Sequence, residues 1–167
     1  MNIFVLSHDT KESAQWHLDK HIVKMPLESA QMLCTALHVS GGQNIPYKPA
    51  YSKHPCTLWT HQSKYNFLWL CELGLALCDE YTYRYGKEHK CREVIMFCKS
   101  NCDLISDVPQ TDFAQAMPDE YKNPNAIEAY REYYRKAKSH IAVWSKRDIP
   151  YWYSPSTCVL YWSVLIT

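Results

Sequence analysis

Apolar residues recur at helical spacing along most of the chain, and this pattern predicts a mainly α-helical protein. Several of the expected helices have boundary signals, such as a capping segment at residues 7–10 and Gly86 as a C-terminal cap. The expected helices run from that cap to about residue 38, from about 56 to 85, from 89 to about 101, and from about 125 to 144. Residues 2–6 are apolar and predict a short strand or an extended arm. We therefore expect a compact helical domain with a short extended N-terminal segment.

A row of polar side chains follows the border of the apolar face of the first expected helix. At about 100° per residue, five of them share one narrow sector: His17, His21, Lys24, Glu28 and Gln31. Pro26 lies within this row and lacks an N–H, which predicts a kink with a free carbonyl nearby. Convergent polar groups beside a core are typical of a ligand-lining helix. The alternative is a bent, half-exposed helix with a few surface charges.

Two long loops, 39–55 and 103–123, are marked by prolines and separate the helical patterns. The last residues, 157–167, are apolar and β-prone, unlike the rest of the chain. We divide the chain into one helical domain over 1–153 and an apolar C-terminal tail over 154–167. Because a monomer would expose the apolar tail, we expect a homo-oligomer, a dimer or a tetramer, with the tail or the first helix at the interface.

Composition and charge narrow the function further. The chain has 167 residues, with 18 Lys plus Arg against 17 Asp plus Glu and a net charge of +1. This balance disfavours a protein that coats duplex DNA by bulk charge, although it leaves room for a local basic pocket. The start of the chain does not resemble a signal peptide, and no apolar run predicts a membrane span. We therefore expect a cytoplasmic protein whose 8 cysteines are reduced thiols.

Two candidate sites suggest metal or nucleophilic chemistry. His17 and His21 are spaced as in many zinc helices, but neither H-E-x-x-H nor C-x-x-C occurs, so no metal and no cofactor are expected. His54 and Cys56 lie at an expected helix N-terminus, where a thiol becomes more acidic. Free N–H groups at such a junction also bind anions, and Thr57 adds a hydroxyl there. We favour anion binding over a nucleophilic thiol.

A third candidate is a pocket for phosphate and base. Basic residues that could contact phosphate are accompanied by aromatic residues that could stack on a base. They are Lys20, Lys24, Lys48, Arg84 and Arg147, with Tyr47, Trp59 and Tyr83. The loop 47–54 interleaves both kinds, which favours a nucleotide ligand, with a solvent-facing loop as the alternative. These basic and aromatic residues belong to the predicted ligand-binding set of a nucleotide-binding domain. The same set also includes His17, His21, Glu28, Gln31, His54 and Thr57.

Two segments resemble the phage pyrimidine-dimer glycosylase called endonuclease V. Residues 14–18, Ala-Gln-Trp-His-Leu, followed by Pro26, resemble its first helix, and residues 147–153, Arg-Asp-Ile-Pro-Tyr-Trp-Tyr, resemble its aromatic C-terminus. The resemblance implies a similar helical fold and an N-terminal α-amine as nucleophile, exposed by removal of the initiator methionine. It also aligns the catalytic glutamate of that enzyme with Lys24.

Two positions depart from the endonuclease V pattern. Residue 2 is Asn, which is too bulky for the usual removal of Met1, so we expect Met1 to stay. Lys24 replaces the acid, which favours anion binding over acid–base chemistry. Glu28 lies one turn later on the same face and could substitute for the acid, but the nucleophile would still be missing.

Four other segments are similar to a widespread family of small phage proteins. They are residues 19–25 (Asp-Lys-His-Ile-Val-Lys-Met), 28–31 (Glu-Ser-Ala-Gln), 54–59 (His-Pro-Cys-Thr-Leu-Trp) and 116–121 (Ala-Met-Pro-Asp-Glu-Tyr). We identify this family as one that includes anti-CBASS sponges. Such sponges are proteins that sequester cyclic-nucleotide immune signals without cleaving them. The resemblance implies a phage immune-evasion protein that binds a cyclic nucleotide, or another nucleotide, in the host cytoplasm.

Non-catalytic capture of such a signal is the function that we expect from the sequence. Two alternatives stay open. One is a DNA glycosylase/lyase acting on damaged or modified pyrimidines, with Lys24 or another amine as Schiff-base nucleophile and Glu28 as acid–base. The other is a structural or protein-binding phage factor that docks through its tail. Duplex DNA is a disfavoured partner because the net charge is near zero.

Overall fold

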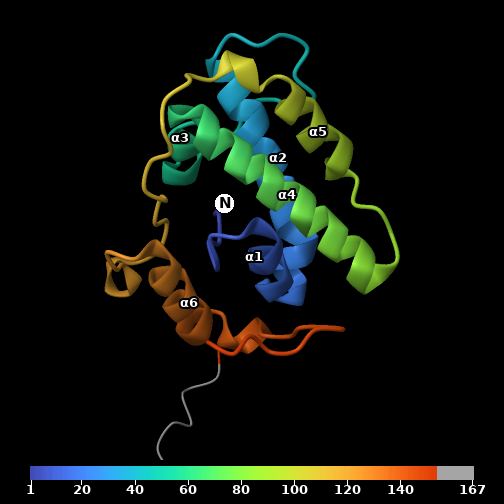
Figure 1. Ribbon diagram of the computed structural model, residues 1–167, viewed down its shortest axis with the longest axis vertical. Coiled ribbons are helices and arrows are strands. Elements are labelled where there is room, and N and C mark those ends of the chain that lie inside the picture. The colour runs from blue at the N-terminus through green and yellow to red at the C-terminus, as the bar shows by residue number, and fades with distance from the viewer. Residues whose placement is uncertain (154–167) are drawn as a thin grey trace, which may run out of the picture.

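The computed structural model describes residues 1–153, and every regular element within this range is a helix (Figure 1). The α-helices are α1 (Thr10–Trp16), α2 (Asp19–Val39), α3 (Pro55–Gln62), α4 (Lys64–Tyr85), α5 (Cys91–Ser100) and α6 (Ala126–Ala137). Short 3-10 turns are η1 (Cys102–Leu104), η2 (Asp119–Tyr121) and η3 (Ser139–Ile141). The expected mainly helical fold is confirmed. In this part of the chain, no helix is long and apolar enough to cross a membrane.

The two longest helices, α2 and α4, pack against each other, and both contact α3 and α5. A long connection leads from this group to α6, and the start of the chain lies between the two parts (Figure 1). The N-terminal segment has extended backbone and belongs to no strand, yet Ile3, Val5 and Leu6 are buried in the core. Phe4 lies between α2 and α6, since its ring stacks on His21 and meets the edge of Tyr134. The N-terminal segment is therefore part of the core.

The first expected helix is two helices, and the break does not lie at the proline. His17 and Leu18 have extended backbone between α1 and α2, whereas α2 continues through Pro26. The backbone N–H of Asp19 donates to the carbonyl of Val143 at 2.8 Å, so the break lets a distant segment pair with the start of α2. The single expected helix is therefore interrupted two turns before Pro26, and the chain is helical on both sides of the proline.

The second expected helix is also divided, at Ser63. Its side-chain oxygen accepts bonds from the backbone N–H groups of Tyr65 and Asn66, at 3.1 and 3.4 Å, and so caps α4. The expected end of this helix is confirmed, because Gly86 adopts a left-handed conformation with φ of 67°.

The last expected helix begins as predicted, at the Asn125 cap, but is shorter than expected. α6 ends at Ala137, because the chain then turns to pair with the α1–α2 junction. The indole N–H of Trp144 donates to the carbonyl of Trp16 at 2.8 Å. The predicted tail, 154–167, lies outside the described residues, so the expected homo-oligomer stays a prediction.

Candidate functional site

Glu28 is a buried carboxylate on α2 that faces the start of the chain. Only 7% of the residue is exposed. Its Oε2 accepts a hydrogen bond from the backbone N–H of Asn2 at 2.8 Å and lies 3.8 Å from the α-amino group of Met1. Its Oε1 lies 3.1 Å from the Nζ of Lys24, one helical turn earlier. The Glu28 carboxylate therefore lies between the α-amine of Met1 and the side-chain amine of Lys24.

The α-amino group of Met1 lies beside this carboxylate. Met1 is half-buried as a residue, but its side chain is only 3% exposed, so its exposed surface lies on its backbone atoms. The hydroxyl of Thr57 contacts the Met1 sulfur at 3.6 Å, which helps to fix the side chain. An amine held near a carboxylate can attack an electrophilic carbon, with the carboxylate as proton acceptor.

His54 borders the same site at the N-terminus of α3. Its Nδ1 accepts a hydrogen bond from the backbone N–H of Cys56 at 3.2 Å, so the imidazole caps the helix. Burial lowers the pKa of His54, and the positive charge of the Met1 amine lowers it further, while Glu28 opposes the shift. Burial also raises the pKa of the Cys56 thiol to about 11, which makes it a poor nucleophile at neutral pH.

His17 and His21 lie in an aromatic cluster of the core. The Nδ1 of His17 donates to the carbonyl of Ser13 at 2.7 Å, and the Nδ1 of His21 lies 2.6 Å from the hydroxyl of Tyr134. Burial lowers the pKa of His17 to about 4 and that of His21 to about 2, so both rings are neutral at pH 7.

We expect these two histidines to make the protein less stable as the pH falls below 6.5. Their folded-state pKa values lie below the ordinary value of 6.5, so the unfolded chain binds more protons between pH 6.5 and 4. Each contributes up to about 1.4 kcal/mol per pH unit in this window. Urea denaturation at a series of pH values measures the slope, and His21→Phe should reduce it. An unfolding midpoint that does not change on acidification would contradict the burial of neutral rings.

Arg84 and Arg147, which we expected to contact phosphate, are bound to carboxylates. The side chain of Arg84 is fully buried, with its Nε 2.7 Å from Glu80 and its Nη1 2.8 Å from Asp19. Arg147 lies 2.8 Å from the other Glu80 oxygen and stacks over the ring of Tyr83 at 4.2 Å. These charges join α4 to α2 and to the segment after α6, which gives both arginines a structural role.

The aromatic residues that we expected to stack on a base are buried to different extents. Trp59 is 3% exposed and packs against Trp69 and Phe113, with ring centroids 6.1 and 5.3 Å away. Tyr47 is half-buried, with its hydroxyl 3.5 Å from the sulfur of Cys91. Lys20 and Lys48 are exposed and Gln31 is half-buried; no hydrogen bond or contact in the structure ties any of the three to Glu28.

The structure thus groups four of the predicted residues around Met1. Glu28 lies near its α-amine, Thr57 contacts its sulfur, Lys24 pairs with Glu28, and the charge of the amine lowers the pKa of His54. Sequence reasoning missed Met1 and Asn2 as parts of this site. The resemblance to an enzyme with an N-terminal nucleophile was the one signal that pointed to the start of the chain.

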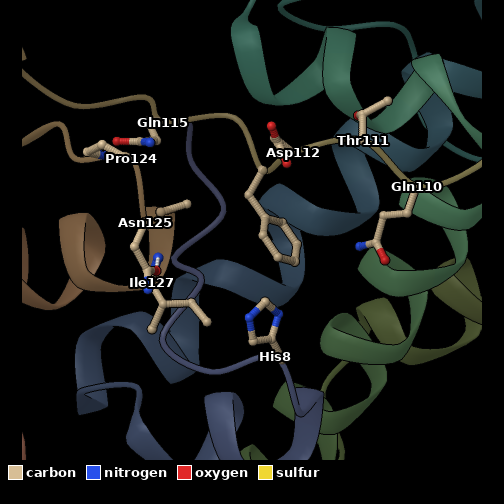
Figure 2. Close-up of a pocket in the computed structure, with 10 residues that line it drawn as sticks. His8, Gln110, Thr111, Asp112, Gln115, Pro124, Asn125 and Ile127 are labelled. Atoms are coloured by element: carbon tan, nitrogen blue, oxygen red, sulfur yellow. Dashed lines mark hydrogen bonds between the residues drawn. The ribbon is translucent and has the colours of Figure 1, made fainter.

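A separate pocket of about 570 Å³ lies between the loop around Asp112 and the N-terminus of α6. Figure 2 shows His8 at its base, with Ile127 and Asn125 on one side and Gln110 on the other. Its lining contains one carboxylate and no lysine or arginine, so it is less suited to phosphate than the amine site. Within residues 1–153, no group of three or more His, Cys, Asp or Glu residues is arranged to hold a metal.

Comparison with known proteins identifies one relationship. The model of a family described as pyrimidine dimer DNA glycosylase matches residues 1–93, which include α1, α2, Glu28, Lys24 and His54. No curated protein and no solved structure matches the chain.

Proposed function

Since the chain belongs to the pyrimidine dimer DNA glycosylase family, we propose that it is a DNA glycosylase/lyase acting on damaged or modified pyrimidines. Retention of Met1 led us to expect that the nucleophile was missing, but the retained residue has an α-amine of its own, and this amine lies beside Glu28. In this proposal the α-amino group of Met1 is the nucleophile, and Glu28 is the acid–base group. The observation that carries the proposal is the α-amine of Met1 3.8 Å from a buried carboxylate. This function replaces nucleotide capture as the preferred one, because the family match and the amine both favour it.

The chemistry follows from these two groups. The amine lone pair attacks C1′ of the deoxyribose, and the bond to the base breaks, so that the base leaves with the electron pair and takes up a proton. Glu28 accepts a proton from the nitrogen and delivers it to O4′ as the C1′–O4′ bond breaks, which opens the sugar and leaves an imine between C1′ and the nitrogen of Met1. Loss of a C2′ proton then breaks the C3′–O bond and cuts the strand. Water releases the amine from the imine.

The α-amine is better suited to this role than Lys24. The α-amine belongs to a residue whose side chain is only 3% exposed, so packing holds it in place. Lys24 is 67% exposed along its side chain and lies 3.1 Å from Glu28. From that position it can contact a DNA phosphate and thereby orient the strand.

Borohydride trapping tests the proposal directly. The protein is incubated with an oligonucleotide that carries an abasic site, and borohydride reduces any imine to a stable amine. We expect a covalent adduct that mass spectrometry maps to Met1. If the folded protein forms no adduct and breaks no glycosidic bond in dimer-containing DNA, the proposal is wrong.

Capture of a cyclic nucleotide is the second candidate, favoured by one observation. Lys24 stands where the resemblance to endonuclease V places the catalytic glutamate, and a cation there suits a bound phosphate. In the same preparation, a panel of cyclic nucleotides can be added and the protein then denatured. Recovery of one intact nucleotide, together with no adduct to DNA, would support capture. The cytoplasmic location remains a prediction from the sequence.

A further inference from the structure

The side-chain amide of Asn2 is hydrogen-bonded on both of its ends. Its Nδ2 donates to the carbonyl of Ala116 at 2.8 Å. Its Oδ1 accepts from the backbone N–H of Ile3 at 2.8 Å and lies 3.6 Å from the sulfur of Cys56. The hydroxyl of Tyr130 lies 3.0 Å from the same Oδ1. The residue is 9% exposed, so these bonds are shielded from water.

The partners of Asn2 come from three separate parts of the chain. Cys56 lies at the start of α3, Tyr130 in α6, and Ala116 in the long connection before η2. Tyr130 is fully buried, and its hydroxyl also lies 2.7 Å from the carbonyl of Ala114. The second residue of the chain is therefore held in a fixed orientation by α3, by α6 and by the connection that precedes η2.

The backbone of Asn2 links this anchor to the reacting groups. Its N–H donates to the Oε2 of Glu28, and its peptide bond leads directly to Met1. Because a peptide bond is planar, fixing Asn2 leaves few rotations by which the amine can move away. The side-chain amide of Asn2 thus fixes the direction in which the backbone of Met1 extends from Asn2.

We propose that Asn2 is a positioning residue, whose side-chain amide holds the α-amino group of Met1 beside Glu28. This inference rests on the proposed function, because it assigns the amine as the nucleophile. Without the anchor, only the packed Met1 side chain and the hydrogen bond from the N–H of Asn2 to Glu28 hold the start of the chain, so the amine spends less time at the carboxylate. A displacement of about 1 Å in a reacting group lowers the rate roughly 100-fold.

Two substitutions remove the anchor from opposite sides. Asn2→Leu replaces the amide by an apolar side chain of similar size that is still too bulky for Met1 removal. Tyr130→Phe removes one hydroxyl and leaves Asn2 in place. We expect both to slow borohydride trapping at Met1 by roughly 10-fold to 100-fold, with the affinity for abasic DNA unchanged. The effect should therefore fall on the rate of the chemical step and not on the Michaelis constant.

Tyr134→Phe is the matched control. Tyr134 lies one turn later on α6, is equally buried, and has its hydroxyl bonded to His21 and not to Asn2. We expect this variant to lose some thermal stability but to trap DNA at the rate of the unsubstituted protein. If Asn2→Leu traps as fast as the unsubstituted protein, the positioning role is wrong while the proposed function stands.

Reductive methylation gives a second measurement that needs no DNA. Formaldehyde and cyanoborohydride label free amines, and mass spectrometry reports the rate at Met1. We expect faster labelling in Asn2→Leu and Tyr130→Phe, because the amine is no longer held at the carboxylate. Equal labelling rates in all folded variants would overturn the positioning role even in a protein that forms no adduct.

Discussion

Replacing Glu28 by Gln should lower the single-turnover rate of base release from damaged DNA by roughly 10²- to 10⁴-fold. The amide keeps the size of the side chain and can still accept the N–H of Asn2, but it cannot take a proton from the Met1 amine. Rapid-quench assays measure the rate, and circular dichroism checks that the helices are retained.

Glu132→Gln is the matched control for this substitution. Glu132 lies on α6, where it pairs with Arg135 at 2.6 Å and Lys136 at 2.7 Å, away from the start of the chain. Its replacement also removes one carboxylate, and we expect the rate of base release to stay the same. A Glu28→Gln variant with more than about half of the original rate would exclude Glu28 as the acid–base group.

Adding Gly-Ser ahead of Met1 should abolish the covalent adduct at the N-terminus. Each added residue moves the α-amino group by up to about 3.5 Å along the chain, so the amine no longer faces Glu28. The peptide nitrogen that remains at Met1 is not a nucleophile. Trapping followed by mass spectrometry measures the loss, and the same dipeptide added at the other end of the chain is the control.

Lys24→Ala distinguishes the two amines that flank Glu28. If the adduct survives the N-terminal extension and disappears in Lys24→Ala, the nucleophile is Lys24, as the sequence alone allowed. If it disappears on extension and survives in Lys24→Ala, the nucleophile is Met1.

The positions of the helices could be predicted where local signals exist. Gly86 ends α4 and Asn125 begins α6, because capping depends on residues within one turn. The division at Ser63 was missed, because apolar residues continue at helical spacing on both sides of it. The end of α6 was missed for another reason: the pairing of Trp144 with Trp16 decides it, and no local pattern encodes that pairing.

The candidate site was predictable only in part. Lys24 and Glu28 share a helix face, so their proximity follows from spacing alone. The approach of Asn2 to Glu28 joins residues 26 positions apart, and the burial of Arg84 depends on Glu80 in its own helix and on Asp19, 65 positions away in α2. A cationic side chain has the same appearance in a sequence whether it meets phosphate or a buried carboxylate, so Arg84 was assigned to a ligand.

The anchoring of Asn2 by Tyr130 has a consequence for how the protein is made. The two residues are 128 positions apart, so the first residues to leave the ribosome meet their partner only when α6 has been synthesised. Nascent chains that contain α1 to α5 therefore carry the α-amino group of Met1 without its anchor. Contacts this distant in sequence slow folding. Under the proposed function, the amine is held beside Glu28 only after α6 has been synthesised and has packed against the start of the chain.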